Sequence, residues 1–343
     1  MPSAAPSRHL GLDLGGTLLK WAVVEQSGRV WRLVGSGMLP TQADSGARGI
    51  AAELVECAVG ASALHGPVRS VGVAVPGRYD AASGTVRFTP NIHVDWSGVP
   101  ITQPIEAALG VRAHLVNDAR AFTLAELRLG AGRGARCMVG ITLGTGVGGG
   151  IVVDGRLHPG LDGAAGEIGH QTVDPDGPLC GCGNRGCVES YARADAISAA
   201  CGTATPEEAV DAARAGDPRA AAGMADAGRY LGIAVANLVT LLTPDAVVFG
   251  GGVAKAGELL FAPIRAELRA RVHMTDPDVV RLLPAELGTL AGAIGSAAYG
   301  AEADGPGSRG RGSRMQAIEA AEAAGTAPGR PHGDPRQPGP ERR

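Results

Sequence analysis

The sequence predicts an α/β protein built from two related halves. Apolar, strand-like segments alternate along the chain with stretches of helical periodicity. A strand, a glycine turn and a second strand occur at DLGGTLLKWAVV (13–24), and the same order recurs at TLGTGVGGGIVV (142–153). With 343 residues, of which 45% are hydrophobic, the chain can bury a core larger than that of one small domain.

The first half is predicted as a domain over residues 9–117. Its segments are a strand hairpin over 9–24, a helix over 47–64, a strand over 71–75, a helix over 101–109 and a strand over 113–116. Because strand-like residues flank the glycines of the hairpin on both sides, it differs from the strand-to-helix opening of a dinucleotide site. Asn117 and Asp118 follow the last strand directly.

The second half is predicted as a domain over residues 118–288. Its segments are a helix over 119–129, a strand over 137–143, a glycine turn over 144–150, a strand from 151, a loop-rich stretch over 160–190, helical periodicity over 205–242 and a strand over 245–254 that opens a helix. A last helix, about 289–302, is expected to pack back on the first half. Residues 1–8 and the Gly-, Pro- and Arg-rich segment 303–343 are expected to be disordered, apart from a short Ala/Glu helix at 315–324.

Composition argues against nucleic acid and membranes as partners. A net charge of −3 and 3% aromatic residues leave neither a basic field nor a stacking platform for nucleic acid. No run of 18 apolar residues is present, and the first residues lack the apolar core of a secretory signal. We therefore expect a cytoplasmic protein, in which clustered cysteines bind metal rather than form disulfides.

Three glycine-rich segments each follow an apolar strand, at 13–17, 144–150 and 250–252. Glycine lets backbone amides approach phosphate oxygens without a Cβ in the way. One such turn is more often purely structural, whereas three together favour a bound nucleotide. The sequence has no GxxxxGK[ST] motif and no GxGxxG motif before an N-terminal helix, which argues against P-loop and dinucleotide-binding folds.

Two aspartates lie at predicted strand ends. Asp13 beside a phosphate would need Mg²⁺ or its bound water between the two negative charges, and Thr17 could donate its hydroxyl to a phosphate. Asp118 could accept a proton from a substrate hydroxyl as that hydroxyl attacks a terminal phosphoryl group. Structural alternatives stay open, since Asp13 could bond its own turn and Asp118 could cap the helix that starts at Ala119.

The strongest chemical signal is one imidazole with three thiols, from His170, Cys180, Cys182 and Cys187. This set suits a tetrahedral Zn²⁺ site, and interspersed glycines let the loop turn sharply. Reduced or redox-active cysteines are the alternative. Glu167 and Glu189 flank the cluster, so a metal-bound loop over 167–189 would hold two carboxylates in positions suited to sugar hydroxyls.

Six motifs together resemble the ROK family, named for repressors, open reading frames and kinases, and in particular its bacterial glucokinase-like sugar kinases. They are DLGGTLLK, VNDARAFTLAE, LGTGVGGGIVVDG, GAAGEIGH, CGCGNRGCVES and VVFGGGVA. The resemblance covers about residues 9–300 in the right order, and the combination of GEIGH with CxCGxxGC is highly specific. It implies the actin-like ATPase (ribonuclease H-like) fold, with two α/β domains around a deep cleft.

The resemblance also implies roles for individual residues. Asp118 would be the catalytic base. The sugar would be bound by Gly77, Asn91, Asn117, Asp118, Glu167, His170 and Glu189. ATP would be bound by Asp13, Gly15, Gly16, Thr17, Lys20, Gly144, Thr145, Gly146, Gly250, Gly251 and Gly252. Structural Zn²⁺ would be bound by His170, Cys180, Cys182 and Cys187, and Mg²⁺ by Asp13.

The implied reaction transfers the γ-phosphoryl group of MgATP to the primary hydroxyl of a hexose, with glucose as the first choice. Mannose, fructose, N-acetylmannosamine, N-acetylglucosamine or a C7 cyclitol are alternatives, because CVESYARADAI and RFTPNIHVDW depart from the usual family patterns beside the sugar site. Polyphosphate is an alternative donor, and a homodimer is usual in the family. A non-catalytic sugar-binding protein and a repressor are remote alternatives, since about eight residues before the first strand are too few for a DNA-binding domain.

Overall fold

The computed structural model describes residues 5–305. Strand β1 begins at Ser7, so regular structure starts two residues earlier than predicted. The predicted disorder beyond residue 305 and the predicted helix at 315–324 lie outside the described residues. The chain up to Ala303 forms one unit by its internal contacts, and the division into domains at residue 117 stays a prediction.

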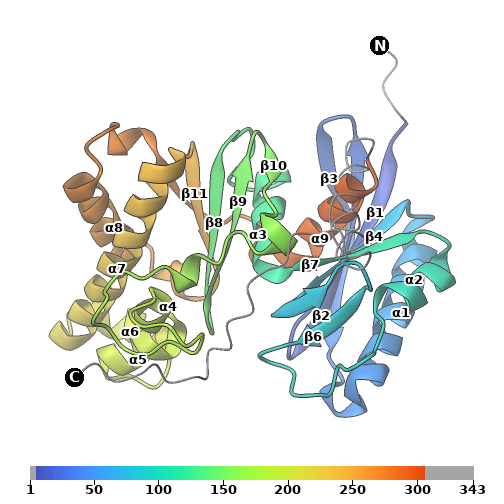
Figure 1. Ribbon diagram of the computed structural model, residues 1–343, viewed down its shortest axis with the longest axis horizontal. Coiled ribbons are helices and arrows are strands. Elements are labelled where there is room, and N and C mark those ends of the chain that lie inside the picture. Colours follow the sequence, from blue (N-terminus) through green and yellow to red (C-terminus); the bar gives the residue numbers. More distant parts are fainter. Residues whose placement is uncertain (1–4, 306–343) are drawn as a thin grey trace, which may run out of the picture. The chain divides into compact units, whose positions relative to one another are not determined.

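The first sheet has the strand order β3-β2-β1-β4-β7 (Figure 1). Its strands are β1 (Ser7–Leu14), β2 (Leu18–Ser27), β3 (Val30–Pro40), β4 (Ser70–Val75) and β7 (Arg112–Asn117). Strands β1, β4 and β7 are parallel, whereas β2 and β3 are antiparallel to their neighbours. The other elements of this part are η1 (Ala43–Ser45), α1 (Gly46–His65), β5 (Arg78–Asp80), β6 (Thr85–Phe88) and α2 (Thr102–Leu109). Leu12, Val73 and Leu54 form part of a buried core between this sheet and α1.

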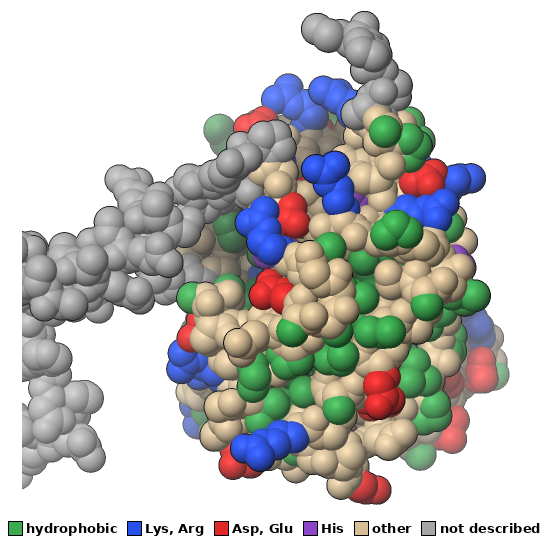
Figure 2. Space-filling view, turned by 90° about the vertical axis from the view of Figure 1, so that its right-hand side faces the viewer, with side chains coloured by type: hydrophobic (Ala, Val, Ile, Leu, Met, Phe, Trp, Pro, Cys, Tyr) green, Lys and Arg blue, Asp and Glu red, His purple; other side chains and the backbone are tan. Residues whose placement is uncertain are grey.

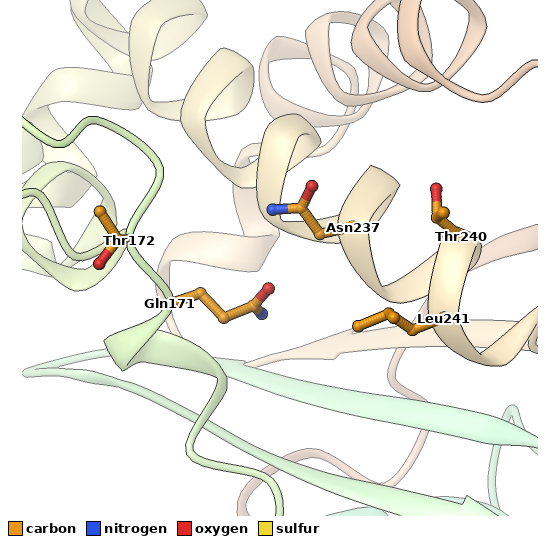
Figure 3. Close-up of a pocket in the computed structure, with 5 residues that line it drawn as sticks. All are labelled: Gln171, Thr172, Asn237, Thr240 and Leu241. Carbon is orange, nitrogen blue, oxygen red and sulfur yellow. The ribbon is translucent and has the colours of Figure 1, made fainter.

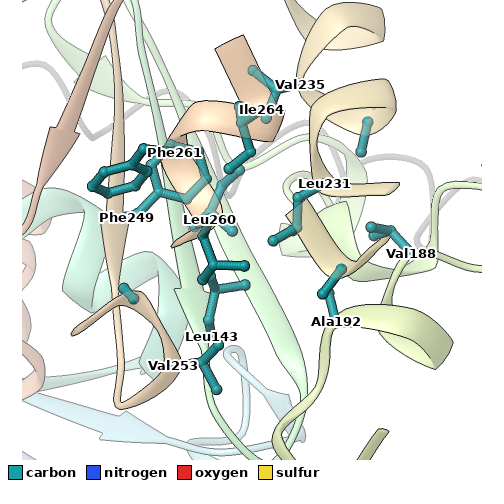
Figure 4. Close-up of a cluster of buried hydrophobic side chains, with 14 of the residues drawn as sticks. Leu143, Val188, Ala192, Leu231, Val235, Phe249, Val253, Leu260, Phe261 and Ile264 are labelled. Atoms are coloured by element: carbon teal, nitrogen blue, oxygen red, sulfur yellow. The ribbon is translucent and has the colours of Figure 1, made fainter. Parts of the chain in front are cut away.

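The second sheet has the strand order β10-β9-β8-β11-β12. Its strands are β8 (Met138–Leu143), β9 (Val147–Val153), β10 (Arg156–Leu157), β11 (Ala246–Gly250) and β12 (Arg281–Pro284). Its helices are α4 (Glu189–Ala192), α5 (Ala194–Cys201), α6 (Pro206–Arg214), α7 (Pro218–Leu242) and α8 (Glu258–Arg271). Short 3₁₀ turns are η2 (Leu161–Gly163), η3 (Ile168–His170), η4 (Val253–Ala256), η5 (Pro277–Val279) and η6 (Gly288–Leu290). Figure 4 shows Leu143 and Phe249 of the sheet with Leu231 and Ile264 of the helices in one core.

Two helices connect the sheets: α3 (Asp118–Arg128) and α9 (Ala291–Ala303). Helix α9 packs on β1 and β4, α3 packs on β8 and β9, and the two helices pack on each other. Glycine makes the close approach possible, because a Cβ on Gly72 of β4 would lie 1.7 Å from the carbonyl oxygen of Ser296. Val24, Leu124 and Val248 share one buried cluster, so a single core runs from the first sheet through α3 to the second.

The structure differs from the prediction at several places. The strand predicted over 245–254 ends at Gly250, and the helical stretch predicted over 205–242 is divided into α6 and α7. The short strands β5 and β6 lie where no element was predicted. Strands β3 and β12 were not predicted, because exposed and half-buried residues predominate in both and give a weak apolar pattern. The glycine turn predicted over 144–150 is wrong for its second half, since β9 begins at Val147. Close packing requires glycine there, because a Cβ on Gly149 would lie 2.4 Å from Cδ1 of Ile168.

The surface of the described part carries charges of both signs. Figure 2 shows Lys and Arg side chains lying beside Asp and Glu side chains on the face it presents. One such group joins Arg8 and Arg32 to Glu25, with N–O distances of 3.3 and 2.8 Å. Among the helices within residues 5–305, none combines the length and apolarity that a membrane crossing requires.

Candidate active site

Predicted site residues lie at the carboxyl ends of strands in both sheets. Asp13 lies near the end of β1 and Asp118 follows β7. In the second sheet, Gly250 ends β11 and is paired with Thr142 of the parallel strand β8. Ligands of open α/β sheets bind beyond the carboxyl ends of the strands, so this arrangement favours a ligand site.

A cavity of about 230 Å³ lies at the ends of β1 and β7. Among the predicted site residues it is lined by Asp13, Gly15, Gly16, Lys20, Asn91 and Asp118. Its other lining residues are Leu14, Pro76, Ala119, Phe122, Thr142, Gly288, Ala291 and Gly292. The cavity therefore combines the first glycine turn, the start of α3 and the start of α9.

Asp13 is buried in this cavity and paired with a cation. The Nζ atom of Lys20 donates to Oδ2 of Asp13 at 3.0 Å, and the two residues face each other across the β1–β2 hairpin. Burial raises the pKa of Asp13, and the charge and hydrogen bond of Lys20 oppose that rise. A Cβ on Gly292 would lie 2.5 Å from Oδ2 of Asp13, so the start of α9 closes tightly over the carboxylate. The side-chain partner of Asp13 is thus Lys20 and not the turn itself.

Backbone contacts hold the first glycine turn in place. The amide of Gly15 donates to the carbonyl of Leu18 at 3.1 Å, and the Thr41 hydroxyl donates to the carbonyl of Gly15 at 2.8 Å. A Cβ on Gly16 would lie 2.9 Å from the carbonyl oxygen of Asn91, so Asn91 lies directly against the turn. Thr17 belongs to the same turn but does not line the cavity.

Asn117 and Asp118 share the start of α3. The Oδ1 atom of Asn117 accepts from the amides of Ala119 at 3.1 Å and Arg120 at 3.3 Å, so Asn117 is the N-cap. Asp118 also accepts from the Ala119 amide, at 2.9 Å, through Oδ1. Burial first, and then the charges of Asp13 and Glu167, raise the pKa of Asp118 to about 6. Asn117, and not Asp118, is therefore the main cap of helix α3.

Arg120 is a site residue that the sequence analysis missed. Its side chain lies inside the protein, where Nε donates to the carbonyl of Ala165 at 2.8 Å and Nη2 donates to Oε1 of Glu167 at 3.0 Å. Glu167, just before η3, has a side chain that is 59% exposed. The motif VNDARAFTLAE contains Arg120, but no local pattern pairs it with a residue 47 positions further on.

The other two glycine segments lie next to each other at the ends of β8 and β11. A Cβ on Gly251, which has φ +87°, would lie 2.1 Å from the carbonyl oxygen of Leu143, directly before Gly144. Thr145 and Gly146 complete the turn into β9, and the Val147 amide that follows donates to Oε2 of Glu189 at 2.9 Å. Gly144, Gly250 and Gly252 belong to these same segments. None of these turn glycines lines the 230 Å³ cavity.

Gly77 turns the chain after β4. Its φ is +82°, and a Cβ there would lie 2.4 Å from the carbonyl oxygen of Phe88. Both features require glycine, because an L side chain would be strained and would collide with β6. Gly77 therefore positions the β5–β6 hairpin, and it does not line the cavity.

The predicted zinc ligands converge in the structure. One ligand atom from each of His170, Cys180, Cys182 and Cys187 lies within 4.8 Å of the others. The Sγ atoms of Cys182 and Cys187 are 3.8 Å apart, and Nδ1 of His170 is 3.7 Å from Sγ of Cys180. Tetrahedral Zn–S bonds of about 2.3 Å imply a similar spacing between two sulfurs, so the set fits Zn²⁺. All cysteines are free thiols, which also fits.

A second hollow, of about 420 Å³, lies between α7 and the segment after η3. Figure 3 shows Gln171 and Thr172 on one side and Asn237, Thr240 and Leu241 on the other. Its lining residues bear amide, hydroxyl and aliphatic groups, and none of them carries a charge. The sequence analysis predicted none of these residues, and they contribute no chemistry to the site described above.

Comparison with known proteins identifies the family. The sequence matches the model of the ROK family over residues 9–302. A glucokinase of Thermotoga maritima is 36% identical over 308 residues, which are 84% of this chain and 95% of that protein. A ROK hexokinase structure from Thermus thermophilus is 35% identical with a TM-score of 0.76, covering 86% of this chain and 98% of the other. The structure of a ROK family glucokinase from Streptomyces griseus, in complex with glucose and AMPPNP, is 33% identical with a TM-score of 0.67, covering 86% and 100%.

The chain belongs to the ROK family. It has the mixed-sheet α/β fold of ROK sugar kinase structures, and it is a sugar phosphotransferase. The family also includes regulators: a xylose repressor of Bacillus spizizenii is 31% identical over 229 residues, which are 66% of this chain and 59% of that protein.

Proposed function

We propose that the chain is an ATP-dependent kinase that transfers the γ-phosphoryl group of MgATP to the primary hydroxyl of a hexose, and that the hexose is glucose. Asp118 carries the proposal, because it is a largely buried carboxylate that shares one cavity with Asp13, Lys20 and a glycine turn. Its pKa of about 6 is close to what a general base needs at neutral pH. Similarity to the Thermotoga and Streptomyces glucokinases supports the choice of acceptor.

The proton movement would be short. Asp118 would accept the proton of the acceptor hydroxyl while that oxygen forms a bond to the γ-phosphorus and the bond from phosphorus to ADP breaks. At pH 7 a carboxyl with a pKa of about 6 is largely ionised, and it is more basic than an ordinary aspartate. Asn117 supports this role by capping α3, so that Asp118 is not needed as the principal cap.

The phosphate chain would lie between the glycine turns. Lys20 would supply positive charge, with Gly15 and Gly16 along one side and Thr17 in the same turn. Gly144, Thr145 and Gly146 would face the phosphates from the second sheet, and Gly250, Gly251 and Gly252 would lie near the adenosine. Asp13 offers a buried carboxylate, the ligand type that Mg²⁺ prefers. The metal would neutralise charge on the phosphates when bound.

The acceptor would be held by polar side chains around Asp118. Asn91 shares its cavity, and Asn117 is its chain neighbour. Glu167 is close enough for its charge to raise the pKa of Asp118. His170 belongs to the metal cluster and Glu189 lies beside it, since Sγ of Cys180 is 3.7 Å from Nδ1 of His170 and 3.9 Å from Oε1 of Glu189. Gly77 would bring the β5–β6 hairpin toward the same sugar.

Zn²⁺ would serve a structural role in this kinase. His170, Cys180, Cys182 and Cys187 would complete a four-coordinate site and leave no position for substrate. The metal would fix the loop that presents Glu167 and Glu189. We further propose the actin-like ATPase arrangement, in which the two halves close on the sugar and exclude water.

Two alternatives rest on specific observations. Mannose, fructose, an N-acetylhexosamine or a C7 cyclitol would present similar hydroxyls, and the segments around His93 and Tyr191 depart from the usual family pattern. The similarity to a xylose repressor favours a sugar-binding protein without catalysis, although the described part of this chain retains Asp118 and Asp13. A homodimer, a cytoplasmic location and polyphosphate as donor stay predictions.

The decisive experiment measures ADP release from MgATP across a panel of hexoses, N-acetylhexosamines and cyclitols, with the Asp118→Asn variant as the blank. Strong turnover with glucose that is absent in the variant would support the proposal. Turnover with another sugar alone would correct the acceptor, and sugar binding without any ADP release would favour the non-catalytic alternative.

A further inference from the structure

The guanidinium of Arg120 joins three segments beside the proposed acceptor site. It contacts the carbonyl of Ala165 and the carboxylate of Glu167, both in the loop between β10 and η3. It also lies close enough to Tyr79 of β5 that its charge and hydrogen bonding, together with the Asn117 backbone, oppose the rise that burial causes in the pKa of Tyr79. A Cβ on Gly163 would lie 3.7 Å from the Tyr79 hydroxyl and 3.9 Å from Nη1 of Arg120, so the loop packs against both.

The two partners of the Arg120–Glu167 ion pair are buried to very different degrees. The Arg120 side chain is 7% exposed, whereas that of Glu167 is 59% exposed. An exposed glutamate ordinarily samples many rotamers, and a ligand that needs one of them must restrict it on binding. A buried arginine anchored by a backbone carbonyl is a rigid donor, so its bond to Oε1 selects one orientation of Glu167 before a ligand arrives.

We infer that Arg120 is a positioning residue for acceptor binding: it holds the Glu167 carboxylate in the orientation that acceptor hydroxyls require, without contacting the acceptor itself. This inference rests on the proposed function, in which Glu167 binds the sugar. Arg120 holds Oε1 from the protein side, which leaves Oε2 for a hydroxyl. The proton acceptor is a different residue, so Arg120 acts on binding and not on the chemical step.

The same helix provides a matched control. Arg128 of α3 also binds one carboxylate and one backbone carbonyl, through Nε to Oε1 of Glu302 at 2.7 Å and Nη2 to Gly155 at 3.0 Å. It lies eight residues after Arg120, or about 12 Å along the helix. Arg128→Lys and Arg120→Lys therefore make the same change in chemically similar surroundings, and only one of them adjoins Glu167.

The test compares the steady-state kinetics of the two variants, using the acceptor that the sugar panel identifies. Arg120→Lys keeps the charge but loses the planar guanidinium, which donates to Ala165 and Glu167 together. We therefore expect KM for the acceptor to rise about 10- to 100-fold, which is equivalent to one charged hydrogen bond. The value of kcat should change less than about threefold. Arg128→Lys should leave both constants within about twofold. An unchanged KM in Arg120→Lys, or an equal rise in Arg128→Lys, would overturn the inference.

A double-mutant cycle distinguishes positioning from direct contact. In a Glu167→Gln background, Arg120→Lys should change KM less than about threefold, because its partner is already altered. If Arg120→Lys raised KM by the same factor with and without Glu167, the arginine would not act through that residue. Tyr79→Phe provides a milder variant should Arg120→Lys unfold: removing the hydroxyl that supports the guanidinium should raise KM about two- to fivefold. An unchanged KM in Tyr79→Phe would then count against the inference.

Direct binding separates this inference from the proposed reaction. Titration calorimetry of glucose into the wild type and Arg120→Lys reports affinity without turnover. If the wild type bound glucose but released no ADP, the proposed kinase activity would fail, whereas weaker binding by Arg120→Lys alone would still support the positioning role. Equal affinities of the two proteins would reject that role whether or not the wild type is active.

Discussion

Replacing Asp118 with asparagine should make the protein inactive and more stable at the same time. The pKa of Asp118 rises from 3.8 to about 6 in the folded protein, chiefly because of burial and the nearby charge of Asp13. The unfolded chain thus ionises this group more readily, so ionisation disfavours folding. At about 1.4 kcal/mol per pKa unit, the rise corresponds to about 3 kcal/mol at pH 7. Asparagine retains an Oδ1 that can accept from the Ala119 amide and removes that cost.

The difference in stability between Asp118→Asn and the wild type should depend on pH. Below about pH 3.5 the carboxyl is mostly protonated in both states, because its pKa in the unfolded chain is 3.8, so the free energies of unfolding of wild type and Asp118→Asn should be nearly equal. Between about pH 4 and 6 the free energy of unfolding of the variant should increasingly exceed that of the wild type. Above about pH 6 the difference should stay constant. In this chain a gain of about 3 kcal/mol corresponds to a rise of about 6 °C in the melting temperature at pH 7.

Two measurements check this reasoning, thermal melts on the ligand-free proteins and a turnover assay with MgATP and the acceptor. Thermal melts from pH 3.5 to 8 give the stability difference, and ADP release gives turnover, which should fall about 10²- to 10⁴-fold. Asp195→Asn, on an exposed residue of α5, provides the control and should change neither. A variant that melts no higher than wild type at pH 7 would refute the burial argument. One that keeps more than about a tenth of the wild-type rate would show that Asp118 is not the base.

Three further predictions concern the metal, the helix packing and pH. Cys182→Ser should lose zinc by elemental analysis, while Cys57→Ser should keep it, and equal zinc in both would defeat the assignment. Gly72→Ala should lower the free energy of unfolding by about 2 kcal/mol or more, because its Cβ meets the Ser296 carbonyl, and a neutral result would contradict the packing described. Gly60→Ala, with open space in α1, should be neutral or stabilise by about 0.5–1 kcal/mol. The kcat/KM of the wild type should fall as pH drops below about 6, where Asp118 becomes protonated, and a flat profile down to pH 4.5 would contradict that assignment.

Local patterns predicted part of this site and missed the rest. The cluster of His170, Cys180, Cys182 and Cys187 was predictable because four side chains that can bind a metal lie within 18 residues. The position of Asp118 was predictable because it directly follows an apolar strand, which ends at Asn117. The Arg120 ion pair was missed because its partner is remote in sequence, and only the fold brings the two together.

Buried polar groups show the same limit. Glu126 is fully buried, and its carboxylate accepts from the amides of Ala131, Glu286 and Leu287. Helical periodicity placed Glu126 correctly in a helix, but an isolated glutamate in such a pattern is ordinarily exposed. The glycine turn was likewise predicted to extend over 144–150, although Gly149 and Gly150 lie within β9, where the lack of a Cβ admits the side chains of Ile168 and Thr123. A glycine-rich composition indicates that the backbone will closely approach another group, but it does not identify that group.

The cavity beside Asp13 has a consequence for how the protein is made. Its walls come from β1, which is made before the other described strands, and from α9, the last helix within residues 5–305. A nascent chain that has already formed the first glycine turn and the metal loop still lacks Gly288, Ala291 and Gly292, so its central carboxylate is open to water. The pocket beside Asp13 is therefore completed only once α9 has been synthesised, and a chain that ends before α9 cannot close it.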